Sequence, residues 1–230
     1  MFRRLFSPVF CAVFLVIFLG IGLAGLSLTS VNHAMRAYFS HDDRQYKADQ
    51  HLQSFFPGDD VFIFLFSGQG LFEDAFLKNM QTAIPQLKAV KNVDRVLSIF
   101  TLDHISGTED GFEVRPLFSQ SDWALPRDVR QQVVLDDRIA PGFVVSEDGK
   151  ALALVVRLEK NLATAQQIEV RTRLFQILKQ QNLSSYLTAV SGPSEVVYMQ
   201  YQAMIDSLNI LMPLASFLSF ALLIWLFPRV

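Results

Sequence analysis

The chain has 230 residues and carries 20 Lys and Arg against 22 Asp and Glu, which gives a formal net charge of −2. This balance lacks the basic excess with which nucleic-acid-binding proteins neutralise phosphates, so nucleic acid is excluded as a partner. The hydrophobic share of 51% and the 21 Phe are high for a soluble protein. We therefore expect part of the chain to lie in a membrane.

The first apolar segment covers residues 5–28 and contains no charged residue. It is longer than the ~20 residues that an α-helix needs to cross a hydrocarbon core, so it predicts a transmembrane helix. A cleavable signal is the alternative, since Arg3 and Arg4 precede the segment, but its apolar core exceeds the usual ~7–15 residues. The single cysteine, Cys11, lies in this span, cannot form an internal disulfide and is expected to fill apolar space.

The polar segment that follows, up to residue 58, contains residues that could suggest metal binding or metal efflux. These residues are His33, His41, His51, Asp42 and Asp43. Their spacing matches no common ligand pattern, so we expect a solvated segment next to the membrane and no metal site.

A β-α-β unit is predicted for residues 61–99. Residues 61–66 form an apolar run of strand length after the turn signal Pro57-Gly58. From Leu71 to Leu87, apolar residues recur at the spacing of an amphipathic helix with one buried face. Residues 93–99 are predicted to form the second strand.

The link between that first strand and helix contains Gly68-Gln69-Gly70, which is similar to the start of a dinucleotide-binding fingerprint. Glu73 stands where the third glycine would be, and a carboxylate there would repel a pyrophosphate. We therefore expect a turn, with Gly70 as the helix cap and Glu73 in the favourable first turn, and no cofactor.

Residues 100–125 show no regular pattern. Asp103, His104 and Ser106 within them could suggest a fragment of a hydrolase site. No nucleophile motif accompanies these residues, so we expect no catalytic residues and no enzymatic activity.

The next segments favour a helix and then a hairpin. Pro126 suits the first turn of a helix over residues 126–136. The clearest local pattern lies in residues 142–158, where two apolar stretches flank residues 147–150, which contain Asp-Gly. Because Asp-Gly is a preferred hairpin turn, both stretches are predicted to be paired strands.

The C-terminal part of the chain is expected to lead back into the membrane. A helix is predicted over residues 162–181 and a strand over residues 186–190. Gly192-Pro193 then ends the strand, and Ser194 is expected to cap a last helix. This helix continues into residues 207–227, a second uncharged apolar segment long enough to span a membrane.

The two spans set the domain organisation. Arg3, Arg4 and Arg229 flank the spans on their outer ends, so the positive-inside rule places both chain ends in the cytoplasm. The predicted segments are a cytoplasmic N-terminus (1–4), transmembrane helix 1 (5–28), an extracytoplasmic domain (29–206), transmembrane helix 2 (207–227) and a cytoplasmic end (228–230).

The predicted element order in the extracytoplasmic domain is β-α-β, a spacer with a short helix, a β-hairpin, and α-β. Two long helices on one face of a small, mainly antiparallel sheet make a ferredoxin-like α+β sandwich. The fold class is therefore α+β, a ferredoxin-like (βαβ-ββ-αβ) domain flanked by two transmembrane α-helices.

Several phrases follow one another along the chain. They are SFFPGDDVFIFLF (54–66), LFEDAFLKNM (71–80), VKNVDRVLSI (90–99), GFVVSEDGKALALVVRL (142–158), VSGPSEV (190–196) and LFPRV (226–230). Together they resemble the N-terminal section of a resistance–nodulation–division (RND) exporter. The detail is similar to the MMPL-type branch, which exports lipids and hydrophobes.

The resemblance implies a porter-type domain of a multi-pass exporter in a bacterial inner membrane. It implies export of hydrophobic small molecules or lipids, driven by proton motive force. Such exporters resemble two copies of six membrane helices, and their proton relay is a carboxylate in later helices. Neither span here contains Asp, Glu, Lys, Arg or His. We therefore expect a truncated or split exporter whose partners are the bilayer, the cargo and the remaining transmembrane part or another subunit.

Two other functions stay open at this point. One is a membrane-tethered sensor with an extracytoplasmic ligand-binding domain, which would need a cytoplasmic signalling module after residue 230. The other is an anchoring subunit.

The phenylalanines near the first strand and helix are expected to be mostly core by their periodicity. They are Phe55, Phe56, Phe62, Phe64, Phe66, Phe72 and Phe76. A minority lining an apolar cargo cleft is the alternative, because apolar pockets bind apolar ligands. The pattern does not single out which rings would do so.

Overall fold

The structure is a computed structural model of the chain. It describes residues 44, 47, 48 and 51, all helical, and residues 60–108, 111–160 and 162–226. Several predicted features lie outside the described residues: the membrane span 5–28, the residues His33, His41, Asp42 and Asp43, and the rings of Phe55 and Phe56.

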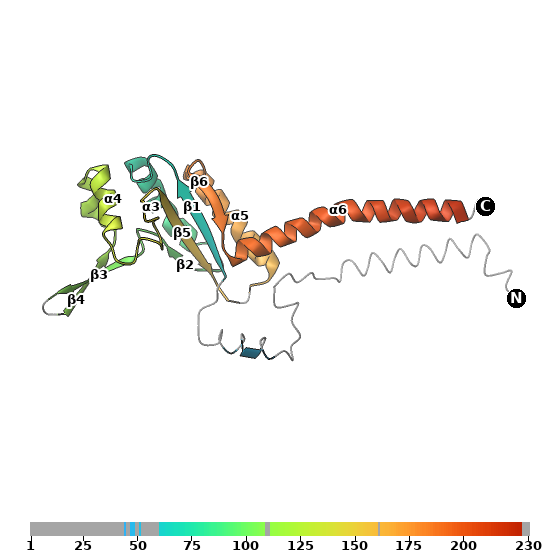
Figure 1. Cartoon of the computed structure of the whole chain (residues 1–230), viewed down its shortest axis with the longest axis horizontal. Coiled ribbons are helices and arrows are strands. Elements are labelled where there is room, and N and C mark those ends of the chain that lie inside the picture. Colours follow the sequence, from blue (N-terminus) through green and yellow to red (C-terminus); the bar gives the residue numbers. More distant parts are fainter. Residues whose placement is uncertain are drawn as a thin grey trace. The chain divides into compact units, whose positions relative to one another are not determined.

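The elements from residue 60 onward are strands and helices (Figure 1). Their bounds are β1 Val61–Ser67, α3 Asp74–Lys88, β2 Val93–Leu97, β3 Asp103–Thr108, β4 Gly111–Pro116, the 3₁₀ helix η3 Gln120–Ala124, α4 Arg127–Leu135, β5 Ala151–Leu158, α5 Thr164–Gln180, β6 Leu187–Ser191 and α6 Pro193–Leu226. The predicted helices over 126–136 and 162–181 are confirmed as α4 and α5.

The central sheet has four strands in the order β2-β5-β1-β6, and each neighbouring pair is antiparallel. β1 pairs with β5 from Val61↔Arg157 to Ser67↔Ala151. On its other side β1 pairs with β6, from Ile63↔Ser191 to Phe66↔Leu187. The expectation of an α+β domain built on an antiparallel sheet is confirmed.

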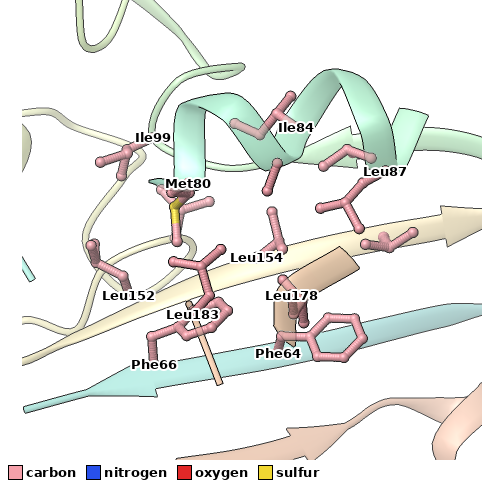
Figure 2. Packing of buried hydrophobic residues seen from close by; sticks show 14 of the residues in the cluster. Phe64, Phe66, Met80, Ile84, Leu87, Ile99, Leu152, Leu154, Leu178 and Leu183 are labelled. Atoms are coloured by element: carbon pink, nitrogen blue, oxygen red, sulfur yellow. The ribbon is translucent and has the colours of Figure 1, made fainter. Parts of the chain in front are cut away.

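One face of this sheet carries the hydrophobic core. Along β5, Leu152, Leu154, Val156 and Leu158 are buried, and the residues between them are only half-buried. Figure 2 shows side chains of α3 facing those of β1 and β5, with Leu178 of α5 beside them. α3 and α5 both pack on this face. Buried residues therefore recur at every second position along the strands and about every 3.6 positions along the helices.

The segment expected to be irregular, residues 100–125, instead contains a second sheet. β3 and β4 form a two-stranded antiparallel sheet of their own (Figure 1), which we call the ribbon. The hydrogen bond from the Leu117 N–H to the Leu102 carbonyl, at 2.9 Å, closes its base. The sequence did not indicate the ribbon, because the apolar residues of β3 and β4 are not on a buried face.

The hairpin predicted over residues 142–158 is only half correct. Its second arm is β5, but residues 142–145 form no strand and make isolated bridges, among them Val145↔Leu152. The carbonyl of Ala140 accepts hydrogen bonds from the N–H groups of Phe143, Val144 and Val145, which coils this arm. Pro141, which has no N–H, and Gly142, at φ +79°, favour that coil over an extended strand.

The last helix, α6, begins at Pro193, directly after Gly192. The predicted cap at Ser194 is wrong: Ser194 lies inside the first turn, and its buried Oγ has no hydrogen-bond partner. The carbonyl of Gly192 accepts the N–H groups of Glu195 and Val196, and proline suits the first position because it lacks an N–H.

Within the described residues, α6 is the helix that is long and apolar enough to cross a membrane, from Pro193 to Leu222. Residues 206–222 of this helix are exposed. Its C-terminal part coincides with the second predicted span, residues 207–227, as far as the structure describes it.

Candidate functional site

The Gly-Gln-Gly corner is a turn, as predicted, but Gly70 is not the helix cap. Gly68 and Gly70 have φ of +127° and +102°, values that glycine adopts without strain. The Glu73 N–H donates to the Gly70 carbonyl at 3.0 Å, and Glu73 is itself the N-cap of α3. Asp74, not Glu73, supplies the acidic group of the first helical turn.

Arg130 of α4 fixes this corner to the segment after the ribbon. Its guanidinium is buried and donates to Asp74 at 2.5 Å and to the carbonyls of Trp123 and Leu125 at 2.6 and 2.9 Å. The hydrogen bond from Arg130 to Asp74 holds the pKa of this carboxyl below its usual value. These contacts satisfy the arginine within the protein, so they make a structural anchor.

His104 has a carboxylate partner that the sequence did not indicate. Its Nδ1 lies 2.5 Å from Oδ2 of Asp137, which follows α4, whereas its neighbour Asp103 is exposed. Burial opposes ionisation of Asp137. The hydrogen bonds from His104 and from the N–H groups of Ile139 and Ala140 outweigh burial and hold the pKa of Asp137 below its usual value.

The His104–Asp137 pair attaches the ribbon to the segment after α4. Backbone donors and one imidazole complete the hydrogen bonding of the Asp137 carboxylate, so the pair has a clear structural role. Among the described residues, no group of three or more His, Cys, Asp and Glu side chains is arranged to hold a metal ion. His51, the one described histidine of the polar segment before the domain, is exposed.

The described phenylalanines of the predicted set are core residues. Phe62, Phe64, Phe66, Phe72 and Phe76 are each at most 2% exposed. Phe76 makes edge-to-face contacts with Phe66 and Tyr186 at centroid distances of 5.7 and 4.9 Å. The prediction that most of the set is core is confirmed for these five rings.

One exposed apolar surface of the α+β domain lies on the ribbon. Ile105, Phe112 and Val114 are 58%, 77% and 52% exposed. Ile105 is directly opposite Val114 and Gly107 is directly opposite Phe112, so these positions share one face. We call this the apolar face of the ribbon. The alternation in residues 111–116 was the signal that could have identified it.

A cavity of about 360 Å³ lies between α3 and the base of the ribbon. Its lining residues are Gln81, Ile84, Lys88, Phe100, Thr101, Pro116, Phe118 and Ser119. Two of the lining residues, Phe100 and Phe118, form an aromatic cluster with Trp123, with centroid distances of 5.4 to 6.1 Å. None of these residues was singled out from the sequence, because the cavity joins segments that share no local pattern.

A second ion pair joins α5 to the start of α6. Arg171 donates from Nε and a terminal nitrogen to the two carboxylate oxygens of Glu195, at 2.6 and 2.7 Å. The guanidinium also lies 4.4 Å from the ring centroid of Phe175 and 3.7 Å from that of Tyr198. The Glu195 side chain is only 8% exposed. We call this arrangement the α5–α6 clamp.

The comparisons with known proteins agree with these observations. The chain matches the model of the MMPL family over residues 38–228, which covers most of its length. No curated protein matches the chain. The resemblance drawn from the short phrases is confirmed, and α6 is consistent with a membrane location. The chain belongs to the MMPL family of exporter-like membrane proteins of the RND type.

Proposed function

We propose that the chain is the N-terminal part of an exporter that moves hydrophobic small molecules or lipids across a bacterial inner membrane, driven by proton motive force. The observation that carries the proposal is the family match, which runs without interruption through the α+β domain and α6. In this proposal the α+β domain lies outside the cytoplasm and meets the cargo, and α6 anchors it in the membrane.

The fold supports a porter-type role. Setting aside the ribbon, η3 and α4 as an insertion, the remaining order is β1-α3-β2 and β5-α5-β6. Its strand order β2-β5-β1-β6 and the two helices on one face correspond to the ferredoxin-like arrangement that the sequence predicts. We infer a ferredoxin-like domain from this correspondence.

The α5–α6 clamp gives the proposed exporter a mechanical connection. Because Glu195 is in the first turn of α6 and Arg171 is on α5, a displacement of α6 in the membrane acts directly on α5. Gly192 tightens the same junction, since its backbone lies directly against the Val61 carbonyl of β1. A conformational change in the membrane would therefore reach the cargo-facing domain.

Proton coupling needs groups outside the two predicted spans. Residues 207–227 contain no Asp, Glu, Lys, Arg or His, and neither do residues 5–28. A proton relay inside a membrane needs such a group, so this chain works with other membrane segments. Its own contribution is the domain that receives the cargo and the helices that tether it.

The orientation is tested by cysteine labelling. After Cys11→Ala removes the single native cysteine, Lys91→Cys places a thiol at an exposed position of the domain. A membrane-impermeant maleimide should label it in intact spheroplasts, whereas Arg229→Cys should be labelled only after permeabilisation. Equal protection of both cysteines until permeabilisation would place the domain in the cytoplasm and contradict the proposal.

Export is tested in the native bacterium. Deletion of the gene should raise retention of an apolar fluorescent probe, and return of the gene should restore efflux. A protonophore should abolish the difference between the two strains. Unchanged retention, together with a changed transcriptional response to apolar compounds, would instead support a sensor.

A further inference from the structure

The cavity between α3 and the ribbon combines apolar and polar groups. Ile84, Phe100 and Phe118 supply apolar side chains, and Gln81 and Lys88 supply polar ones. Its volume of about 360 Å³ is at the lower end of the range for ligand pockets, roughly 300–1,000 Å³. The cavity can hold part of a small molecule with a polar group.

The apolar face of the ribbon is continuous with this cavity. Pro116 lines the cavity and belongs to the same strand face as Val114 and Phe112, since alternate residues of a strand share a face. At about 3.4 Å per residue, that face extends about 14 Å from Pro116 to Phe112. An apolar chain that leaves the cavity along β4 therefore meets apolar side chains over this length.

Charge identifies the kind of polar group that fits. Lys88, in the last turn of α3, is the only charged residue among the described residues that line the cavity, and it is exposed. Asp103 opposes Pro116 across the ribbon and is also exposed, but it does not line the cavity. This exposed cation on the lining favours an anionic group in the cavity, and the Asp103 carboxylate outside the cavity weakens the attraction.

We propose that the cavity and the apolar face of the ribbon form one binding site for a single-chain amphiphile with a carboxylate head group. The carboxylate binds beside Lys88, and the hydrocarbon chain follows Pro116, Val114 and Phe112. The assignment of this ligand as cargo rests on the proposed function, whereas binding itself does not depend on transport.

The ribbon is suited to respond to such a ligand. A two-stranded sheet is marginally stable by itself, and the described contacts that hold this one lie at its base, in the Leu102–Leu117 hydrogen bond and the His104–Asp137 pair. A hydrocarbon chain on the apolar face covers Phe112, the most exposed of its large side chains. Binding should therefore protect the amides of β4 from hydrogen exchange.

The site is tested with laurate as the probe and the full chain in nanodiscs of zwitterionic phospholipid. Trp225→Phe leaves Trp123, which contacts Phe100 and Phe118 of the cavity, as the only tryptophan. Its fluorescence then reports binding. We expect laurate to bind about tenfold more tightly than dodecanol, because one partly exposed charge contact is worth about one decade of affinity.

Variants separate the head group from the chain. Lys88→Gln should weaken the binding of laurate by about tenfold and leave the binding of dodecanol unchanged. Lys88→Arg should restore the affinity for laurate. Lys91→Gln is the matched control, since Lys91 is an exposed lysine three positions on that does not line the cavity. Phe112→Ser should weaken both ligands, and Asp103→Asn should strengthen laurate alone.

The outcomes have distinct meanings. Lys88→Gln without effect on laurate, or a preference for dodecyltrimethylammonium, overturns the proposal. If Phe112→Ser abolishes self-association and leaves laurate binding intact, the proposal is also overturned. The apolar face then binds a second copy of the chain. If laurate binds as expected but deletion of the gene leaves efflux unchanged, the binding site is supported and the exporter function is overturned. If efflux depends on the gene but laurate does not bind, the exporter function is supported and the binding site is overturned.

Discussion

Replacing Arg171 by Met should destabilise the α+β domain by about 3 kcal/mol, because it leaves the Glu195 carboxylate buried without its cation. Glu195 is 8% exposed at the side chain and receives two hydrogen bonds from Arg171, at 2.6 and 2.7 Å. Removal of one partner of such a pair costs about 3–5 kcal/mol. The lower end applies here because Glu195 keeps the favourable field of the helix N-terminus.

Part of the loss comes from the aromatic contacts of the guanidinium. Arg171 lies over the rings of Phe175 and Tyr198, and each cation–π contact contributes about 0.5–1 kcal/mol. Met keeps an apolar stem of similar length, so the packing of the aliphatic part is largely preserved. Glu195→Gln should cost less, about 1–2 kcal/mol, since an amide still accepts one hydrogen bond from Arg171.

The assay is a double-mutant cycle on the full chain in detergent, with urea unfolding followed by Trp123 fluorescence in the Trp225→Phe background. The double variant Arg171→Met/Glu195→Gln should lose less unfolding free energy than the sum of the losses in the two single variants. The coupling energy should exceed about 1.5 kcal/mol. Arg173→Met, on an exposed position of the same helix, should change stability by less than about 0.5 kcal/mol. Additive single changes would refute the argument that the clamp is an interacting pair.

Further expectations follow from other parts of the structure. Gly192→Ala should destabilise the domain by more than about 2 kcal/mol, because φ is +108° and a Cβ would overlap the Val61 carbonyl oxygen. Phe76→Ala should cost about 3–5 kcal/mol, whereas Phe112→Ala should cost less than about 0.5 kcal/mol, as urea unfolding can measure. Because the folded-state pKa of Asp137 is lowered, its carboxylate stabilises the fold above the unfolded pKa of about 3.9, and this contribution is lost as the pH falls further. The difference in unfolding free energy between the parent and Asp137→Asn should therefore shrink below about pH 4.

Controls make these expectations specific. Gly107→Ala should leave stability nearly unchanged, since no positive φ occurs there and a Cβ would meet open space. An equal loss for Gly107→Ala and Gly192→Ala would exclude the steric explanation. Equal losses for Phe76→Ala and Phe112→Ala would contradict the placement of the core. A pH-independent difference for Asp137→Asn would show that its charge does not matter.

The sequence predicted those parts of the fold whose signal is local. The strand β1 and the helices α3 and α5 each bury one face, so their hydrophobic periodicity is visible within a single element. Register is partly predictable for the same reason, since a shift of one residue would expose Phe62, Phe64 and Phe66.

Other features depend on contacts between distant segments. The ribbon was missed because its apolar residues are exposed, and the periodicity rule assumes that they are buried. The prediction of a strand for the first arm of the hairpin over 142–158 was wrong, because the coil at the Ala140 carbonyl competes with strand pairing. Ser194 looked like a cap from its residue type, yet Gly192 is fixed by its approach to β1.

The candidate site was not predictable for a related reason. The partners Arg130 and Asp74 are 56 positions apart, and Arg171 and Glu195 are 24 apart. No single-sequence pattern connects such residues. The cavity likewise joins α3 with residues on both sides of the ribbon, and its polarity depends on Lys88, which by itself resembles an ordinary basic residue at a helix C-terminus.

Two arginines that make ion pairs, the buried Arg130 and the half-buried Arg171, suggest how motion is distributed in this domain. Arg130 holds α4 to the start of α3, and Arg171 holds α5 to α6, so both junctions resist local opening. The ribbon lies between them in the sequence, with an apolar face that is exposed and hydrogen bonds that are mostly accessible to water. Local opening should therefore require the least free energy in β3 and β4. In the proposed exporter, a ligand that covers this face would change the stability of β3 and β4, and the clamp would carry displacements of α6 to the rest of the domain.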